Sequence, residues 1–104
     1  MESEQNYHYF FRTLSNRLRI DILTCLKNGE KCVNDIAETI GEGRSKTSHA
    51  LKQLLDCNFV YVKKKGRKRI YHLNEDTIQP LLELADIHVT ENCDECSLHK
   101  KKGV

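Results

Sequence analysis

Apolar residues recur every three or four positions over the first 58 residues, and this spacing predicts four amphipathic helices. Their expected limits are about residues 4–14, Ser15 or Asn16 to Asn28-Gly29, Val33 to Gly41, and Arg44 or Ser45 to Asn58. The positions expected to be buried in the last three helices are Leu18, Ile22, Cys25, Leu26, Val33, Ile36, Ala37, Ile40, Ala50, Leu51, Leu54 and Leu55.

Beyond Asn58 the apolar pattern changes to alternation. Residues 59–62 and 70–73 predict two antiparallel strands, with Gly66 in the turn between them. A last helix is expected from about Glu75, and because Pro80 lies inside its pattern, it either starts late or bends there. Its expected inward positions are Ile78, Leu81, Leu82 and Ala85. The sequence therefore predicts a mainly α fold with a β-hairpin, in the order α-α-α-α-β-β-α.

The composition suits one small soluble domain, with 104 residues of which 38% are hydrophobic and 31% charged. No apolar run approaches the roughly 18 residues that a membrane-spanning helix needs. The first ten residues lack the order of a signal peptide, so we expect a cytoplasmic protein without a membrane partner. Five cysteines in such a chain favour packing, metal binding or redox chemistry over a disulfide framework, and Cys25 and Cys57 are expected to pack.

The net charge of +2 conceals a strong segregation of charge along the chain. Residues 63–69 contain six Lys or Arg and no acid, whereas residues 70–99 contain seven acids and no Lys or Arg. A localised block of cations is typical of a polyanion partner, although a solvated hairpin tip is the simpler alternative.

Two short helices joined by Gly41-Glu42-Gly43, the second with a polar and basic outer face, are typical of a helix-turn-helix. The cationic hairpin that follows is typical of a wing that lies along a DNA backbone. Together they predict a winged helix-turn-helix that binds double-stranded DNA. The residues expected to contact DNA are Arg44, Ser45, Lys46, Ser48, His49, Lys63, Lys64, Arg67 and Lys68.

Over about residues 10–75 the sequence resembles the ArsR/SmtB family of small dimeric repressors. The pieces that carry the resemblance are LSNRLRIDIL, EKCVNDIAE, S-x-x-S-x-A-L-K-Q-L and VKKKGRKRIYHL, in this order. The resemblance implies a homodimer, formed through the first and last helices, on an operator with two half-sites. It also implies release from DNA when an inducer, usually a metal ion, binds.

The resemblance implies two places for such an inducer. One lies in the third helix, where Cys32 matches the first of two cysteines and Asn34 replaces the second. This site looks incomplete, and Cys32 is expected to be a half-buried packing thiol, with an additional role in metal binding left open.

The other place lies on the last helix, in the pattern D-x-H-x10-H-x2-[HE]. Asp86, His88 and His99 match this pattern, and Lys102 takes the fourth position. His88 and His99 would lie about 16 Å apart along one helix, so a shared ion needs the antiparallel helix of a partner subunit.

Cys93 and Cys96 form a C-x2-C pair that is typical of zinc or softer ions. One arrangement adds a cysteine to Asp86, His88 and His99. Another builds a thiolate site from Cys93 and Cys96 with His99 or Cys32, and a third gives these cysteines no role. The expected inducer is Zn(II) or a soft metal or metalloid ion such as Cd(II) or As(III).

The sequence thus predicts a metal-released DNA-binding repressor, with residues 1–92 as the DNA-binding and dimerisation domain and residues 93–104 as a Cys/His/Lys-containing tail. A repressor switched by a Cys93–Cys96 disulfide is one alternative, and a winged helix that contacts only proteins is another. No enzymatic activity is expected, because no Ser-His-Asp set, P-loop or carboxylate pair is recognisable. The C-x2-C pair also does not open a helix after a strand, as it does in thiol-disulfide enzymes.

Overall fold

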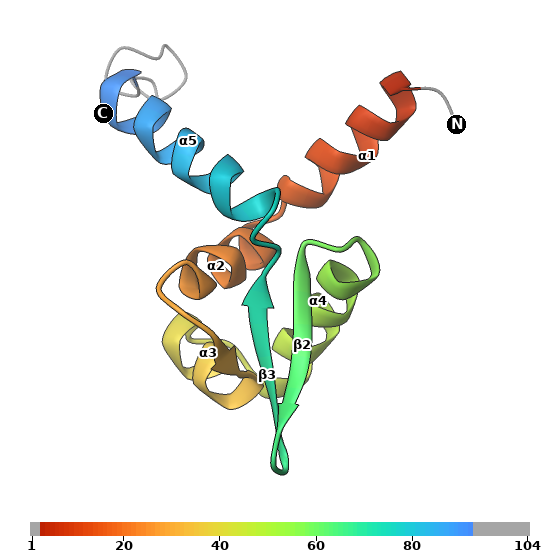
Figure 1. Cartoon of the computed structure of the whole chain (residues 1–104), viewed down its shortest axis with the longest axis vertical. Helices are drawn as coiled ribbons and strands as arrows, with labels where there is room; N and C mark the ends of the chain where they lie inside the picture. The colour runs from red at the N-terminus through yellow and green to blue at the C-terminus, as the bar shows by residue number, and fades with distance from the viewer. Residues whose placement is uncertain (1–2, 93–104) are drawn as a thin grey trace. The chain divides into compact units, whose positions relative to one another are not determined.

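The computed structural model describes residues 3–92, and the chain forms two compact units, residues 1–74 and residues 75–104. The elements of the first unit are α1 (Ser3–Leu14), α2 (Arg17–Leu26), β1 (Lys31–Cys32), α3 (Val33–Ile40), α4 (Arg44–Asp56), β2 (Val60–Lys65) and β3 (Lys68–Leu73) (Figure 1). The second unit holds α5 (Ile78–Asn92). The five predicted helices and the hairpin are confirmed.

The predicted order of elements lacked one strand. β1 lies between α2 and α3, where Lys31 pairs with Tyr71 and Cys32 with Ile70. The sheet is therefore three-stranded and antiparallel, in the order β1-β3-β2, and the chain order is α-α-β-α-α-β-β-α. A strand of two residues is too short to show alternation, so only its pairing with a distant strand reveals it.

Side chains from α2, α3, α4 and the sheet form the core of the first unit. Of the positions expected to be buried in α2, α3 and α4, four are only half-buried, namely Leu18, Val33, Ile40 and Leu55, and Leu23 is buried in addition. Thr47 is also fully buried, because its hydroxyl donates to the Gly43 carbonyl at 2.9 Å and so needs no water. The fully or nearly fully buried apolar residues of these helices are Ile22, Leu23, Cys25, Leu26, Ile36, Ala37, Ala50, Leu51 and Leu54.

Local sequence signals set where the helices begin and end, close to the predicted positions. The Asn16 side chain accepts a hydrogen bond from the Arg19 backbone N–H at 3.0 Å and so caps α2. Gly41 ends α3 with a φ of 73°, and Asn58 follows α4 with a φ of 60°, both in the left-handed region.

Two contacts hold α1 against the rest of its unit. The rings of Phe10 and Phe59 lie 5.3 Å apart. The Arg19 guanidinium in α2 donates to the Thr13 carbonyl at 3.2 Å and to Gln53 Oε1 in α4 at 3.1 and 3.3 Å. Arg19 therefore connects the end of α1 with the middle of α4.

The last helix starts late rather than near Glu75. It begins at Ile78, which places Pro80 in the first turn, where the missing N–H leaves no helical bond unmade. Ala85 is exposed, contrary to the expected inward position, and the helix continues to Asn92. Among the described helices none has the length and apolar character required to cross a bilayer.

Candidate nucleic-acid interface

The exposed side of α4 carries the predicted reading residues. Ala50, Leu51 and Leu54 are buried, and they fix the orientation of the helix. The predicted residues at its N-terminal end are all exposed, namely Arg44, Ser45, Lys46, Ser48 and His49. Polar and basic side chains at this end of a helix can reach base edges in a major groove, while backbone N–H groups face phosphates.

The turn end of the hairpin of β2 and β3 projects beyond the helices of its unit, whereas the other end packs against them (Figure 1). It closes in a two-residue turn, Gly66-Arg67, in which Gly66 has a φ of 64°. The strand register places Lys64 opposite Arg69 and Lys65 opposite Lys68. Like charges directly opposite one another destabilise a hairpin. The pairing therefore carries a cost that an anion lying against the hairpin would offset.

A cleft of about 840 Å³ lies between α4, β3 and the start of α3. One wall is a stripe of α4 in which Arg44, Ser48 and Lys52 follow at intervals of four residues. The opposite wall comes from the wing turn and β3, and the residues there include Arg67, Lys68 and Arg69. The lining of the groove thus contains five cations and only two acids, Asp35 and Asp56. The arrangement suits the phosphate backbone of a nucleic acid.

Lys52 and Arg69 were not among the predicted contact residues. Lys52 could have been found, because it continues the stripe of Arg44 and Ser48 by one further turn. Arg69 belongs to the basic block, but its place in the cleft depends on how the sheet is placed relative to α4.

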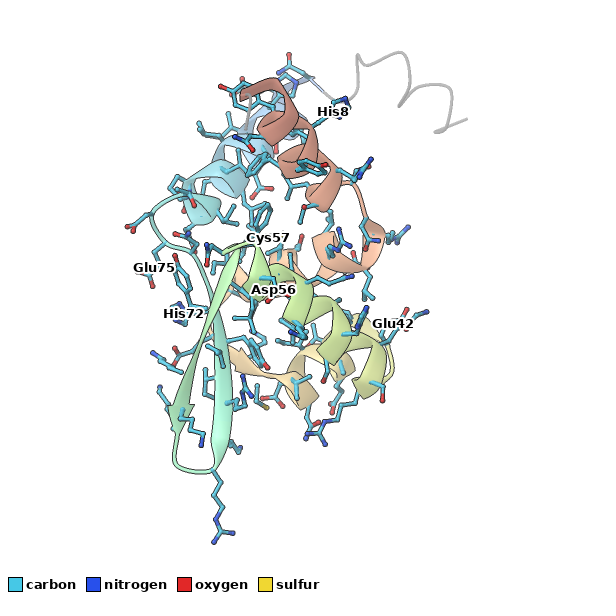
Figure 2. All side chains as sticks on the ribbon, turned by 90° about the vertical axis from the view of Figure 1, so that its right-hand side faces the viewer. His8, Glu42, Asp56, Cys57, His72 and Glu75 are labelled. Carbon is cyan, nitrogen blue, oxygen red and sulfur yellow. The ribbon has the colours of Figure 1, made fainter. Side chains whose placement is uncertain are left out.

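Weak ion pairs lie at the two ends of α4, marked by Glu42 and Asp56 in Figure 2. Lys46 Nζ lies 3.8 Å from Glu42 Oε1, and Lys52 Nζ lies 3.8 Å from Asp56 Oδ2. Exposed pairs four residues apart contribute about 0.3–0.5 kcal/mol each, so phosphates can displace them.

A stronger cluster involves Glu30, which the sequence did not indicate. Its carboxylate contacts Lys63 Nζ at 2.8 Å and Lys65 Nζ at 2.6 Å. Hydrogen bonds from Lys63 and then Lys65 lower the pKa of Glu30 from 4.5 to about 2. The partners are separated by more than thirty residues, so no local pattern connects them.

The described cysteines are all free thiols. Cys25 is buried, as expected, and Cys32 is half-buried at the position preceding α3, also as expected. Cys57 is exposed, so the expectation that it packs was wrong: it caps the end of α4, and the chain returns to the core only at Phe59.

The predicted metal ligands are only partly within the described residues. Asp86 and His88 are exposed on α5, where the Asn92 amide lies 3.5 Å from His88 Nδ1 and donates to the His88 carbonyl at 3.1 Å. Cys93, Cys96 and His99 lie outside the described residues. Across residues 3–92 no three His, Cys, Asp or Glu side chains are placed to hold an ion together. A carboxylate and an imidazole are suitable zinc ligands, so Asp86 and His88 fit part of a site that requires others.

The sequence of this chain is similar to those of known bacterial regulatory proteins. Residues 16–62 match the family described as bacterial regulatory protein, arsR family. The chain is 32% identical over 100 residues to the arsenical resistance operon repressor of Bacillus subtilis, which covers 95% of this chain and 87% of the relative. It is 32% identical over 82 residues to a cadmium resistance transcriptional regulatory protein, a CadC homolog of Staphylococcus aureus, which covers 78% and 68%.

Among solved structures, the fold resembles a homodimeric winged helix-turn-helix DNA-binding domain from Mycobacterium bovis. The TM-score is 0.77 at 20% identity, over 93% of this chain and 94% of that one. The first unit and the cleft that it contains are therefore parts of a winged helix-turn-helix.

Proposed function

Because this chain belongs to the ArsR family of bacterial regulatory proteins, we propose that it is a transcriptional repressor that binds operator DNA and is released by a metal or metalloid ion. The observation that carries the proposal is the cleft, where cations from α4 and the wing face each other across one groove. Such a DNA-binding regulator would act in the cytoplasm, and it needs no enzymatic activity.

In the proposed complex the N-terminal half of α4 enters a major groove. Arg44, Ser45, Lys46, Ser48 and His49 would then face base edges and the adjoining phosphates. The wing would lie along the backbone beside this groove, with Lys64, Arg67 and Lys68 at phosphates, whereas Lys63 is held by Glu30. The opposed charges of Lys64 and Arg69 support this assignment, because a phosphate would relieve their repulsion, whereas Lys65 already contacts Glu30.

We propose that the repressor is a homodimer, as the Mycobacterium bovis domain is. Tyr7 and Phe11 on α1 are exposed, as are Leu84, Ile87 and Val89 on α5. On each of these helices, large exposed apolar side chains are typical of a surface that contacts a partner. Two subunits would place their reading helices on half-sites about 34–36 Å apart, one turn of DNA.

We propose that the inducer ion binds to Asp86 and His88 of one subunit, with His99 and Cys93 or Cys96 as further ligands. These residues lie on or beyond α5, the helix proposed for the dimer interface, so the binding of an ion would be coupled to subunit arrangement. Thiolate and imidazole ligands select Zn(II) or softer ions, which agrees with the arsenical and cadmium resistance in the relatives' names.

The proposal is tested by measuring the affinity of the protein for duplex operator DNA at low salt, with and without Zn(II), Cd(II) and As(III). We expect at least one ion to weaken binding in the unmodified protein and in Cys57→Ser, which removes an exposed thiol outside the proposed site. The same ion should have no effect on His88→Ala or Cys93→Ser. Release by mild oxidant with no response to any ion would favour the Cys93–Cys96 disulfide switch, and failure to bind DNA at all would refute the proposal.

A further inference from the structure

Glu30 lies beside the wing because β1 joins the sheet. The residue immediately after it, Lys31, pairs with Tyr71 on β3, which brings Glu30 to the edge of the sheet. Lys63 and Lys65 are two residues apart on β2, so their side chains share one face of the sheet. The two Glu30 oxygens contact these two ammonium groups separately, Oε2 at Lys63 and Oε1 at Lys65.

The cations of the basic block are therefore not equivalent. Lys63 and Lys65 are held by Glu30, whereas Lys64, Arg67, Lys68 and Arg69 have no ion-pair partner among residues 3–92. Both held lysines remain accessible, with exposed fractions of 48% and 58%. An approaching phosphate can reach the same ammonium groups that the carboxylate occupies.

We propose that Glu30 is an internal substitute for DNA phosphate, which occupies Lys63 and Lys65 and so limits the number of phosphates that each wing neutralises. The inference rests on the proposed DNA-binding function and adds a residue that sets its affinity. A carboxylate and a phosphate oxygen bind an ammonium group in the same way, so the two compete. Glu30 is charged throughout the neutral range, and its lowered pKa keeps this competitor charged in acidic solution as well.

The effect of Glu30 can be measured through the salt dependence of the affinity for DNA. Each cation that neutralises a DNA phosphate adds about 0.9 to the slope of log affinity against log salt concentration. Two lysines withheld by Glu30 therefore correspond to about 1.8 per wing. At 0.1 M salt each additional contact raises affinity by up to about 8-fold, because a slope of 0.9 acts over a tenfold change from 1 M. A wing with fewer phosphate contacts is also released more readily by an inducer.

The test compares Glu30→Gln with Glu38→Gln. Both substitutions raise the net charge by one, but Glu38 is exposed on α3 and has no ion-pair partner in the part of the chain described. Duplex binding is measured by fluorescence anisotropy from about 0.05 to 0.3 M salt. For Glu30→Gln we expect a slope larger by about 1–2 per wing and an affinity at least about 5-fold higher at 0.1 M, whereas Glu38→Gln should leave the slope unchanged.

A second comparison tests the two lysines, both with Glu30 present and in Glu30→Gln. Replacing Lys63 and Lys65 together by Gln should alter the slope little in the unmodified protein but remove the whole gain in the Glu30→Gln background. A loss of about 1.8 per wing in the unmodified protein would show that both lysines already contact phosphate and would overturn the inference. A lower affinity or an unchanged slope for Glu30→Gln would overturn it as well. These results refute the role of Glu30 alone, whereas failure of the unmodified protein and Glu38→Gln to bind duplex DNA refutes the proposed function.

Discussion

Replacing Arg19 by Met should destabilise the first unit much more than replacing Arg17 by Met. Both arginines lie in the first turn of α2, but their surroundings differ. Arg19 is half-buried and donates to the Thr13 carbonyl and twice to Gln53 Oε1, whereas Arg17 is 94% exposed and lies 3.7 Å from Asp21. Met retains the apolar stem in both variants, so the comparison isolates the guanidinium group.

The expected loss in the free energy of unfolding follows from the number of these hydrogen bonds and from how far they are buried. A hydrogen bond from a charged donor contributes about 1.5–3 kcal/mol when buried, and less when half-exposed. Two of the three bonds of Arg19 share one acceptor, so we expect a net loss of about 1–3 kcal/mol. The exposed Arg17–Asp21 pair should contribute about 0.3–0.5 kcal/mol. For a domain of this size each kcal/mol corresponds to about 4–8 °C in Tm.

The assay is urea unfolding followed by circular dichroism, supported by thermal melting. A double-mutant cycle with Gln53→Ala should give a coupling of about 0.5–1.5 kcal/mol between Arg19 and Gln53. Because Gln53 lies in α4, Arg19→Met should also weaken DNA binding at concentrations where the protein is fully folded. The reasoning is refuted if the two arginine variants have the same free energy of unfolding, or if the coupling to Gln53 is zero.

Three further predictions follow from the core and the wing. Leu54→Ala should lower the free energy of unfolding by about 2–5 kcal/mol, because Leu54 is fully buried, and the half-buried Leu55→Ala should cost clearly less in the same urea titration. Replacing Arg67 and Lys68 together by Gln should reduce the salt slope of DNA binding by about 1.8 per wing, and an unchanged slope would exclude both from phosphate contact. The pKa of Glu30 is lowered in the folded state, so its stabilising effect is present above about pH 4.5 and disappears as the pH falls toward 2. Urea titrations of the unmodified protein and Glu30→Gln should therefore differ most above pH 5, and a difference that grows on acidification would contradict this assignment.

The sequence alone determined the elements whose signals are local. Helix spacing, the Asn16 cap and the left-handed residues Gly41 and Asn58 each act within a few residues of one another, so they could be identified before any packing was known. The exposure of the reading residues of α4 also followed from the apolar stripe on its opposite side. The wing was recognisable because its six cations are contiguous and its turn contains Gly66.

Tertiary structure decided the features that join distant parts of the chain. β1 exists because Lys31 and Cys32 pair with a strand almost forty residues away, and that pairing brings Glu30 to Lys63 and Lys65. The cleft likewise depends on how the sheet and α3 are placed relative to α4, which no periodicity encodes. A local pattern fixes backbone conformation and the side of an element that avoids water. Which charges meet depends on how the elements are packed, and that is set by the whole core at once.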